Sequence, residues 1–116
     1  VYTHHPGDLN LDHQIIAKTV LTACRPKPGC SVKELYQFEV PSSTDWSFGY
    51  TFAPNVFVDV RDTLATKLDA MEVYQGEVHP YPHPRSREAL TSIATRWGSM
   101  VGLYAAEAFQ LVRSIR

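Results

Sequence analysis

The residues best suited to chemistry are crowded into one short segment, from His4 to His13. This run, Thr-His-His-Pro-Gly-Asp-Leu-Asn-Leu-Asp-His from residue 3, holds three of the five histidines and two aspartates. Neutral imidazole and carboxylate groups together suit zinc, iron or nickel better than magnesium or calcium. The segment therefore predicts a metal site. The alternative is a polar turn in which Asp8 and Asp12 merely cap the following helix.

The place of this segment between an expected strand and an expected helix favours the metal site. Residues 1–3 are typical of the end of a buried strand, and Ile16, Val20 and Ala23 are spaced like the inner face of a helix. Asn10 or Asp12 is expected to cap that helix. In α/β proteins, ligands bind at such junctions between the carboxyl end of a strand and the amino end of a helix.

The rest of the chain supplies further strands and helices. Strands with alternating or apolar patterns are expected at 32–40 and 55–60, and the proline-rich residues 78–86 are expected to be irregular. Two helices are expected from Asp62 or Thr63 to residue 75 and from a Ser86 cap to residue 97. A further helix is expected over Met100–Arg113, with these side chains facing inward: Val101, Tyr104, Ala108, Leu111 and Val112. The order predicts one α/β domain, residues 1–116, with a mostly parallel sheet that begins upstream of residue 1.

Five segments carry a family resemblance when taken in order: Thr3–His13, Glu34–Glu39, Phe52–Asp59, His83–Ser86 and Ala105–Phe109. The first resembles the second zinc motif, His-Pro-Asp-His, of the PIG-L/LmbE-like family of zinc-dependent N-acetylglucosaminyl deacetylases. The others extend the resemblance over nearly the whole chain. It implies that the chain is the C-terminal portion of a Rossmann-like three-layer fold.

The resemblance also implies roles for single residues. His13 corresponds to the family's histidine zinc ligand, and Asp12 to the aspartate that helps orient the site. Asn10 stands where the family has a histidine that supports the oxyanion or protonates the leaving amine. Asparagine donates hydrogen bonds but is no proton donor near neutral pH, so His4 or, preferably, His5 takes the acid role, or else the chemistry differs.

The implied activity is Zn²⁺-dependent removal of an acetyl group from an N-acetylated amino sugar or its conjugate. The family's Ala-His-Pro-Asp-Asp-Glu motif, which supplies two further zinc ligands and the general base, has no counterpart in these residues. We therefore expect the C-terminal part of such an enzyme, inactive alone and a poor zinc binder. Two alternatives stay open: a non-catalytic sugar-binding or interaction module, or half of an assembly, such as a homo-oligomer, that rebuilds the site.

Other residues carry weaker hypotheses. His83 and Arg85 in the proline-rich segment either line the substrate mouth or belong to a rigid surface connection. Trp46 either stacks on a sugar ring or anchors a loop in the core. Glu107 either reaches a pocket or pairs with an arginine such as Arg113.

The overall composition excludes binding that depends on bulk charge. The net charge of −1 and a pI of about 6.6 give no electrostatic footprint for nucleic acid or an anionic membrane. No apolar run reaches the length of a membrane-spanning helix, and no leader opens the chain, so we expect a cytoplasmic protein. Cys24 and Cys30 are expected to be free thiols, with a local disulfide as the alternative.

Overall fold

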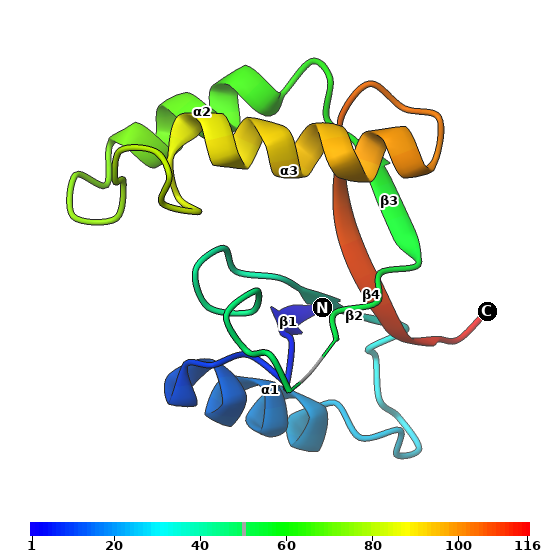
Figure 1. The fold of residues 1–116 in the computed structure, drawn as a ribbon. Helices are drawn as coiled ribbons and strands as arrows, with labels where there is room; N and C mark the ends of the chain where they lie inside the picture. Colours follow the sequence, from blue (N-terminus) through cyan, green and yellow to red (C-terminus); the bar gives the residue numbers. More distant parts are fainter. Residues whose placement is uncertain (50) are drawn as a thin grey trace. The chain divides into compact units, whose positions relative to one another are not determined.

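The computed structural model describes residues 1–49 and 51–116, and this part of the chain has the expected mixed α/β character (Figure 1). Its elements are β1 (Tyr2–His4), α1 (Leu11–Ala23), β2 (Glu34–Phe38), β3 (Val56–Asp59), α2 (Leu64–Glu72), α3 (Arg87–Met100) and β4 (Ala106–Ser114). The three helices are therefore present near their expected positions. Among these described residues, no helix has the length and apolar character needed to cross a membrane.

The four strands form one sheet in the order β1-β2-β4-β3. Strands β1 and β2 run parallel, whereas β2 and β4 run antiparallel. Strand β3 is also antiparallel to β4, since the amides of Asn55 and Val60 donate to the carbonyls of Phe109 and Ala105 respectively. The prediction of a mostly parallel sheet is therefore not confirmed: the described strands form a mixed sheet in which antiparallel pairing predominates.

The prediction of a helix over Met100–Arg113 is wrong, because strand β4 occupies most of that range. Helix α3 continues through Gly98 to Met100, and a turn with Gly102 at φ +76° then reverses the chain. Alanines in this segment favour a helix locally. In the sheet, however, β4 has hydrogen-bonded neighbours on both edges, and alternate residues Ala106 and Ala108 are buried. Tertiary pairing therefore overrides local propensity here.

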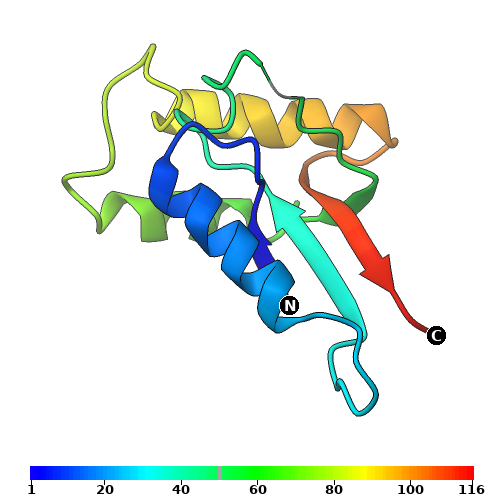
Figure 2. The same cartoon turned by 90° about the horizontal axis from the view of Figure 1, so that it is seen from below.

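The chain divides into two compact units, and residues 1–56 with 109–116 form the first. Helix α1 packs on β1, as Figure 2 shows from below. Ala17 of α1 and Leu35 of β2 are almost completely buried. Arg113 Nη2 donates to the carbonyl of Cys24, at 2.8 Å, and this bond fastens the end of α1 to β4. Hydrophobic burial and long-range polar contacts together hold α1 against the strands.

Residues 57–108 form the second unit, in which α2 and α3 pack together. Its buried cluster contains Val60, Ala94 and Ala105. Ser86 caps α3 as predicted, its Oγ accepting a hydrogen bond from the amide of Ala89 at 3.1 Å. The helix therefore begins at a specified residue and presents one buried stripe to the core of this unit.

Both cysteines are free thiols in the structure. Cys24 follows α1 directly and is buried, and Cys30 in the loop after it is partly buried. No disulfide joins these two residues, so the loop between α1 and β2 is held by backbone hydrogen bonds such as that from Cys30 to Lys27, at 3.0 Å.

Candidate functional site

The segment from His4 to His13 folds as a tight connection between β1 and α1. The amide of His5 donates to the carbonyl of Phe38 at 3.2 Å, which keeps the connection on the β2 side. The amide of Asp8 donates back to the carbonyl of His5 at 3.1 Å and closes a turn. Asn10 then caps α1, because its Oδ1 accepts from the amide of Asp12 at 2.9 Å. The local sequence thus places the end of the strand and the first helical turn next to each other.

Asp8 is the centre of a buried polar network, and its side chain is fully inaccessible. Oδ1 accepts hydrogen bonds from the Asn10 amide, at 2.8 Å, and from the Ser43 hydroxyl. Oδ2 accepts from the Thr44 hydroxyl at 2.7 Å. Burial raises the pKa of Asp8, but the hydrogen bonds from Ser43, Asn10 and Thr44, with His13 nearby, outweigh burial and hold this pKa below its ordinary value. Asp8 is therefore a buried carboxylate.

His13 lies directly against this carboxylate. Its Nδ1 is 3.1 Å from Oδ1 of Asp8, although the ring N–H is not aligned for a regular hydrogen bond. Its ring stacks on that of His4, with 3.9 Å between centroids and 7° between planes. Burial lowers the pKa of His4, the nearby His13 lowers it further, and Asp8 opposes both effects. Two histidines and one carboxylate therefore meet at the junction of β1 and α1.

His5 is buried under the same connection rather than stacked with the other two histidines. Its Nδ1 accepts a hydrogen bond from the Gly7 amide at 3.1 Å, and its ring meets Phe52 edge to face at 5.6 Å. Burial lowers the pKa of His5, with Asp8 partly opposing this effect. His5 is therefore neutral near pH 7, and its proton lies on Nε2 because Nδ1 is an acceptor.

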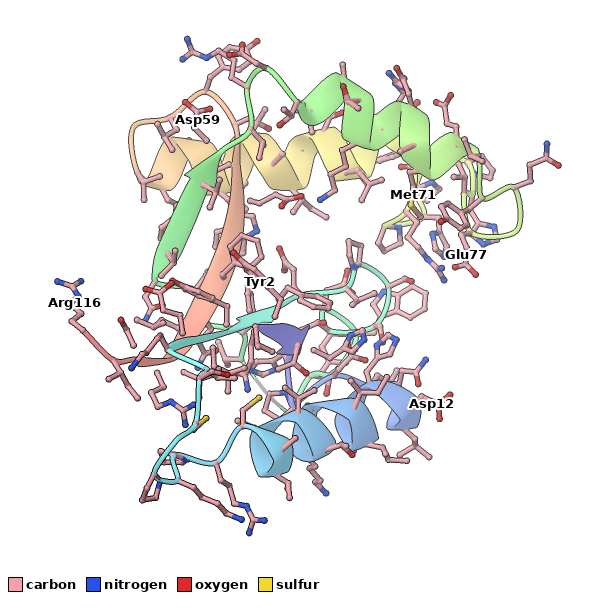
Figure 3. The ribbon with its side chains drawn as sticks, turned by 180° about the vertical axis from the view of Figure 1, so that it is seen from behind. Tyr2, Asp12, Asp59, Met71, Glu77 and Arg116 are labelled. Atoms are coloured by element: carbon pink, nitrogen blue, oxygen red, sulfur yellow. The ribbon has the colours of Figure 1, made fainter. Side chains whose placement is uncertain are left out.

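Asn10 and Asp12, the residues with catalytic roles in the resemblance, are exposed at the start of α1, where Figure 3 labels Asp12. Asn10 uses its oxygen for the helix cap and retains its amide N–H groups. The carboxylate that contacts His13 belongs to Asp8, which the sequence placed in the cluster without a role of its own. Its partner Ser43 is 35 residues away, and no local pattern connects the two. The contact of Asp8 with His13 therefore had no signal in the sequence.

His83 and Arg85 lie in the loop between α2 and α3 of the second unit. His83 Nδ1 accepts from the Arg85 amide at 3.1 Å, and its ring lies 4.4 Å from that of His79. Arg85 forms an ion pair with Glu77, labelled in Figure 3. These contacts hold the loop in a defined conformation.

Two other candidates have different surroundings. Trp46, in the loop after β2, is 44% exposed, which leaves part of its ring accessible to a ligand. Glu107 of β4 pairs with Lys67 of α2, whereas Arg113 donates to backbone carbonyls. Of the two alternatives for Glu107, the pocket is the one found, since Glu107 and Lys67 line a pocket beside Val60 and Ala70, and its ion-pair partner is this lysine rather than an arginine.

Of the side chains at this site, His13 can supply one ligand atom to a metal ion. Over residues 1–49 and 51–116, no group of three or more histidine, cysteine or acidic side chains is arranged to hold a metal ion. The stacked rings of His4 and His13 lie in parallel planes, so their in-plane lone pairs do not converge on a single ion. His13 Nε2 has no protein partner in the described part of the chain, and Asp8 lies at the opposite ring nitrogen.

Comparison with known proteins adds no relative. No family model matches the chain, and no curated protein matches it. The geometry of the segment from His4 to His13 and the motifs that surround it are therefore the basis for a functional proposal.

Proposed function

We propose that this chain is the C-terminal part of a zinc-dependent N-deacetylase that resembles the PIG-L/LmbE-like family and has a Rossmann-like fold. One observation carries the proposal: the ring of His13 has a buried carboxylate at Nδ1 and no protein partner at Nε2 among the described residues. Metal-binding histidines almost always direct their second ring nitrogen at a carboxylate, a carbonyl or water. His13 has the surroundings of such a ligand.

His13 contributes one ligand, whereas catalytic zinc sites use three protein ligands. We place the other two, together with the general base, in a segment outside this chain, as the family resemblance implies. When bound, zinc supplies Lewis-acid polarisation of the acetamide carbonyl and acidifies water.

The residues of this chain would bind and orient the acetylated amino sugar. The side-chain N–H groups of Asn10 and the Nε2–H of His5 are donors for the oxygen that gains charge. Trp46 offers an aromatic face to the sugar ring. The role of His83 and Arg85 at the substrate mouth stays a prediction from the sequence. The free thiols of Cys24 and Cys30 suit a reducing compartment such as the cytoplasm.

The test is zinc-dependent release of acetate from N-acetylglucosamine by the complete protein that contains this chain. The His13→Ala variant should fall to the rate of the metal-free control, because it loses a ligand. Lys18→Ala, which removes an exposed side chain from the outer part of α1, should retain the unmodified rate. Full activity in His13→Ala would refute the proposal.

Zinc binding measured on the 116-residue chain alone separates the contribution of His13 from that of the ligands outside this chain. We expect weak zinc binding by calorimetry and no acetate release, because one imidazole gives no closed coordination. His13→Ala should abolish the weak binding, and the matched variant His79→Ala should preserve it. Acetate release by this chain alone would show that the remaining ligands do not come from another segment.

A further inference from the structure

We infer that Asp8 is a positioning residue that fixes His13 in the tautomer with its proton on Nδ1, so that the lone pair on Nε2 is available to a ligand. The use of Nε2 for zinc rests on the proposed function. The tautomer itself does not, because it follows from contacts within this chain.

The chemistry of the contact between Asp8 and His13 favours this tautomer. A carboxylate only accepts hydrogen bonds, and Oδ1 of Asp8 lies 3.1 Å from Nδ1 of His13. Nδ1 is buried and has no regular hydrogen bond in the described part of the chain, so Oδ1 of Asp8 is the polar atom that determines its surroundings. If Nδ1 carried a lone pair, two electron-rich atoms would lie 3.1 Å apart with no proton between them. In neutral His13 the proton therefore belongs on Nδ1.

Asp8 is held in place by groups other than His13. Its two oxygens accept from the Asn10 amide and from the hydroxyls of Ser43 and Thr44. Those hydroxyls are themselves fixed, since the amides of Ser43 and Thr44 both donate to the carbonyl of Val40, at 3.1 and 2.9 Å. These three donors leave about one of the roughly four lone-pair sites of the carboxylate for the contact with His13. Asp8 is therefore oriented before any ligand arrives.

The ring of His13 is restricted in its rotation. The face of His4 lies parallel to it at 3.9 Å, and α1 begins two residues earlier at Leu11. A flip of the ring about the Cβ–Cγ bond would exchange Nδ1 for a C–H group and lose the contact with Asp8. The stacked His4 ring and the buried Asp8 carboxylate thus favour one orientation as well as one tautomer.

The test reads the tautomer directly by long-range ¹H–¹⁵N correlation spectra of the labelled 116-residue chain. Spectra are recorded near pH 8, above the ordinary histidine pKa of about 6.5. We expect a protonated Nδ1 and an unprotonated Nε2 for His13 in the unmodified chain. A protonated Nε2 there would overturn the inference without any variant.

Substitutions then assign the effect to Asp8. Asp8→Ala should shift His13 toward the Nε2–H form, and Asp8→Asn, which keeps an acceptor oxygen, should restore part of the Nδ1–H population. Asp62→Ala is the matched control, because Asp62 is an exposed aspartate outside the site, and this variant should leave the tautomer unchanged. Dispersed amide signals report whether each variant is folded. A folded Asp8→Ala chain with an unchanged tautomer would also overturn the inference, and if that variant unfolds, the Asp8→Asn chain and the unmodified chain decide.

In the complete protein, Asp8→Ala should weaken zinc binding by about 10- to 100-fold, the usual cost of losing a partner of a metal-binding histidine. If Asp8→Ala instead lost zinc binding as completely as His13→Ala, Asp8 would itself be a zinc ligand, which would contradict a positioning role. The two proposals can fail separately. If His13 is the Nδ1–H tautomer but the complete protein has no deacetylase activity, only the proposed function is refuted. If the complete protein is active but His13 is the Nε2–H tautomer, only the inference about Asp8 is refuted.

Discussion

The hydroxyl of Thr44 joins Asp8 to the end of β2. It lies 2.7 Å from Oδ2 of Asp8, to which it donates, and 2.7 Å from the amide nitrogen of Val40, from which it accepts. Asp8 and Thr44 are 36 residues apart, so this single hydroxyl links the loop after β1 to the loop after β2. The position of the buried carboxylate therefore depends on both loops.

Replacing Thr44 by valine should reduce the free energy of unfolding by about 1–3 kcal/mol, because a buried carboxylate oxygen and a backbone amide lose their partner while the side-chain shape is kept. Urea denaturation followed by circular dichroism measures the change. Thr22→Val is the matched control: its hydroxyl is exposed on α1, and the expected change is within about 0.5 kcal/mol. Equal effects in the two variants would show that the Asp8 network is not a stabilising one.

Stability should also fall in acid through Asp8. The pKa of Asp8 is below its ordinary value of 3.8 in the folded chain, so at intermediate pH the unfolded chain binds more protons at this residue. Its contribution is therefore complete above about pH 4 and is lost as the pH falls through the folded pKa. Urea midpoints measured across this range should fall less steeply with acid in Asp8→Asn than in the unmodified chain. Asp45→Asn, at an exposed position, should keep the unmodified slope.

The cap and the proposed chemistry of Asn10 can be separated by two substitutions. Asn10→Ala should lose about 1 kcal/mol of stability, because α1 loses its cap, whereas Asn10→Ser keeps a capping oxygen and should be close to the unmodified chain. Thermal or urea unfolding of the 116-residue chain measures both.

In the complete protein, the same Asn10→Ser variant should lower kcat for acetate release by about 10²- to 10³-fold, because serine does not place an amide donor at the oxyanion. The stability measurement serves as the control, since the cap is retained. Unchanged turnover in this variant would restrict Asn10 to its structural role.

Gly98 is required where α3 meets the turn before β4. A Cβ at this position would lie 2.8 Å from the backbone N and Cα of Ala105 and from the carbonyl oxygen of Leu103. Gly98→Ala should therefore destabilise the chain by about 1–3 kcal/mol, although alanine is the better helix former. Gly76→Ala, with nothing within 4 Å of the added Cβ, is the matched control and should be neutral or slightly stabilising. A neutral Gly98→Ala would contradict this close approach.

The sequence alone determined the features that depend on near neighbours. The cap of α1 by Asn10 and the cap of α3 by Ser86 were predictable, because a cap bonds within three residues and a helix repeats every few residues. The crowding of His4, His5 and His13 between a strand and a helix was also visible without a structure. These features depend on residues close together in the chain, and the folded structure retains them.

Only the tertiary structure decided the partner of His13 and the fate of the C-terminal segment. Asp8 became a buried carboxylate because Ser43 and Thr44 reach it from a loop more than 30 residues away. The segment from Ala106 became β4 because two strands pair with it, although its alanines favour a helix. Long-range hydrogen bonds and sheet pairing set both outcomes, and neither has a period or a spacing that the sequence displays.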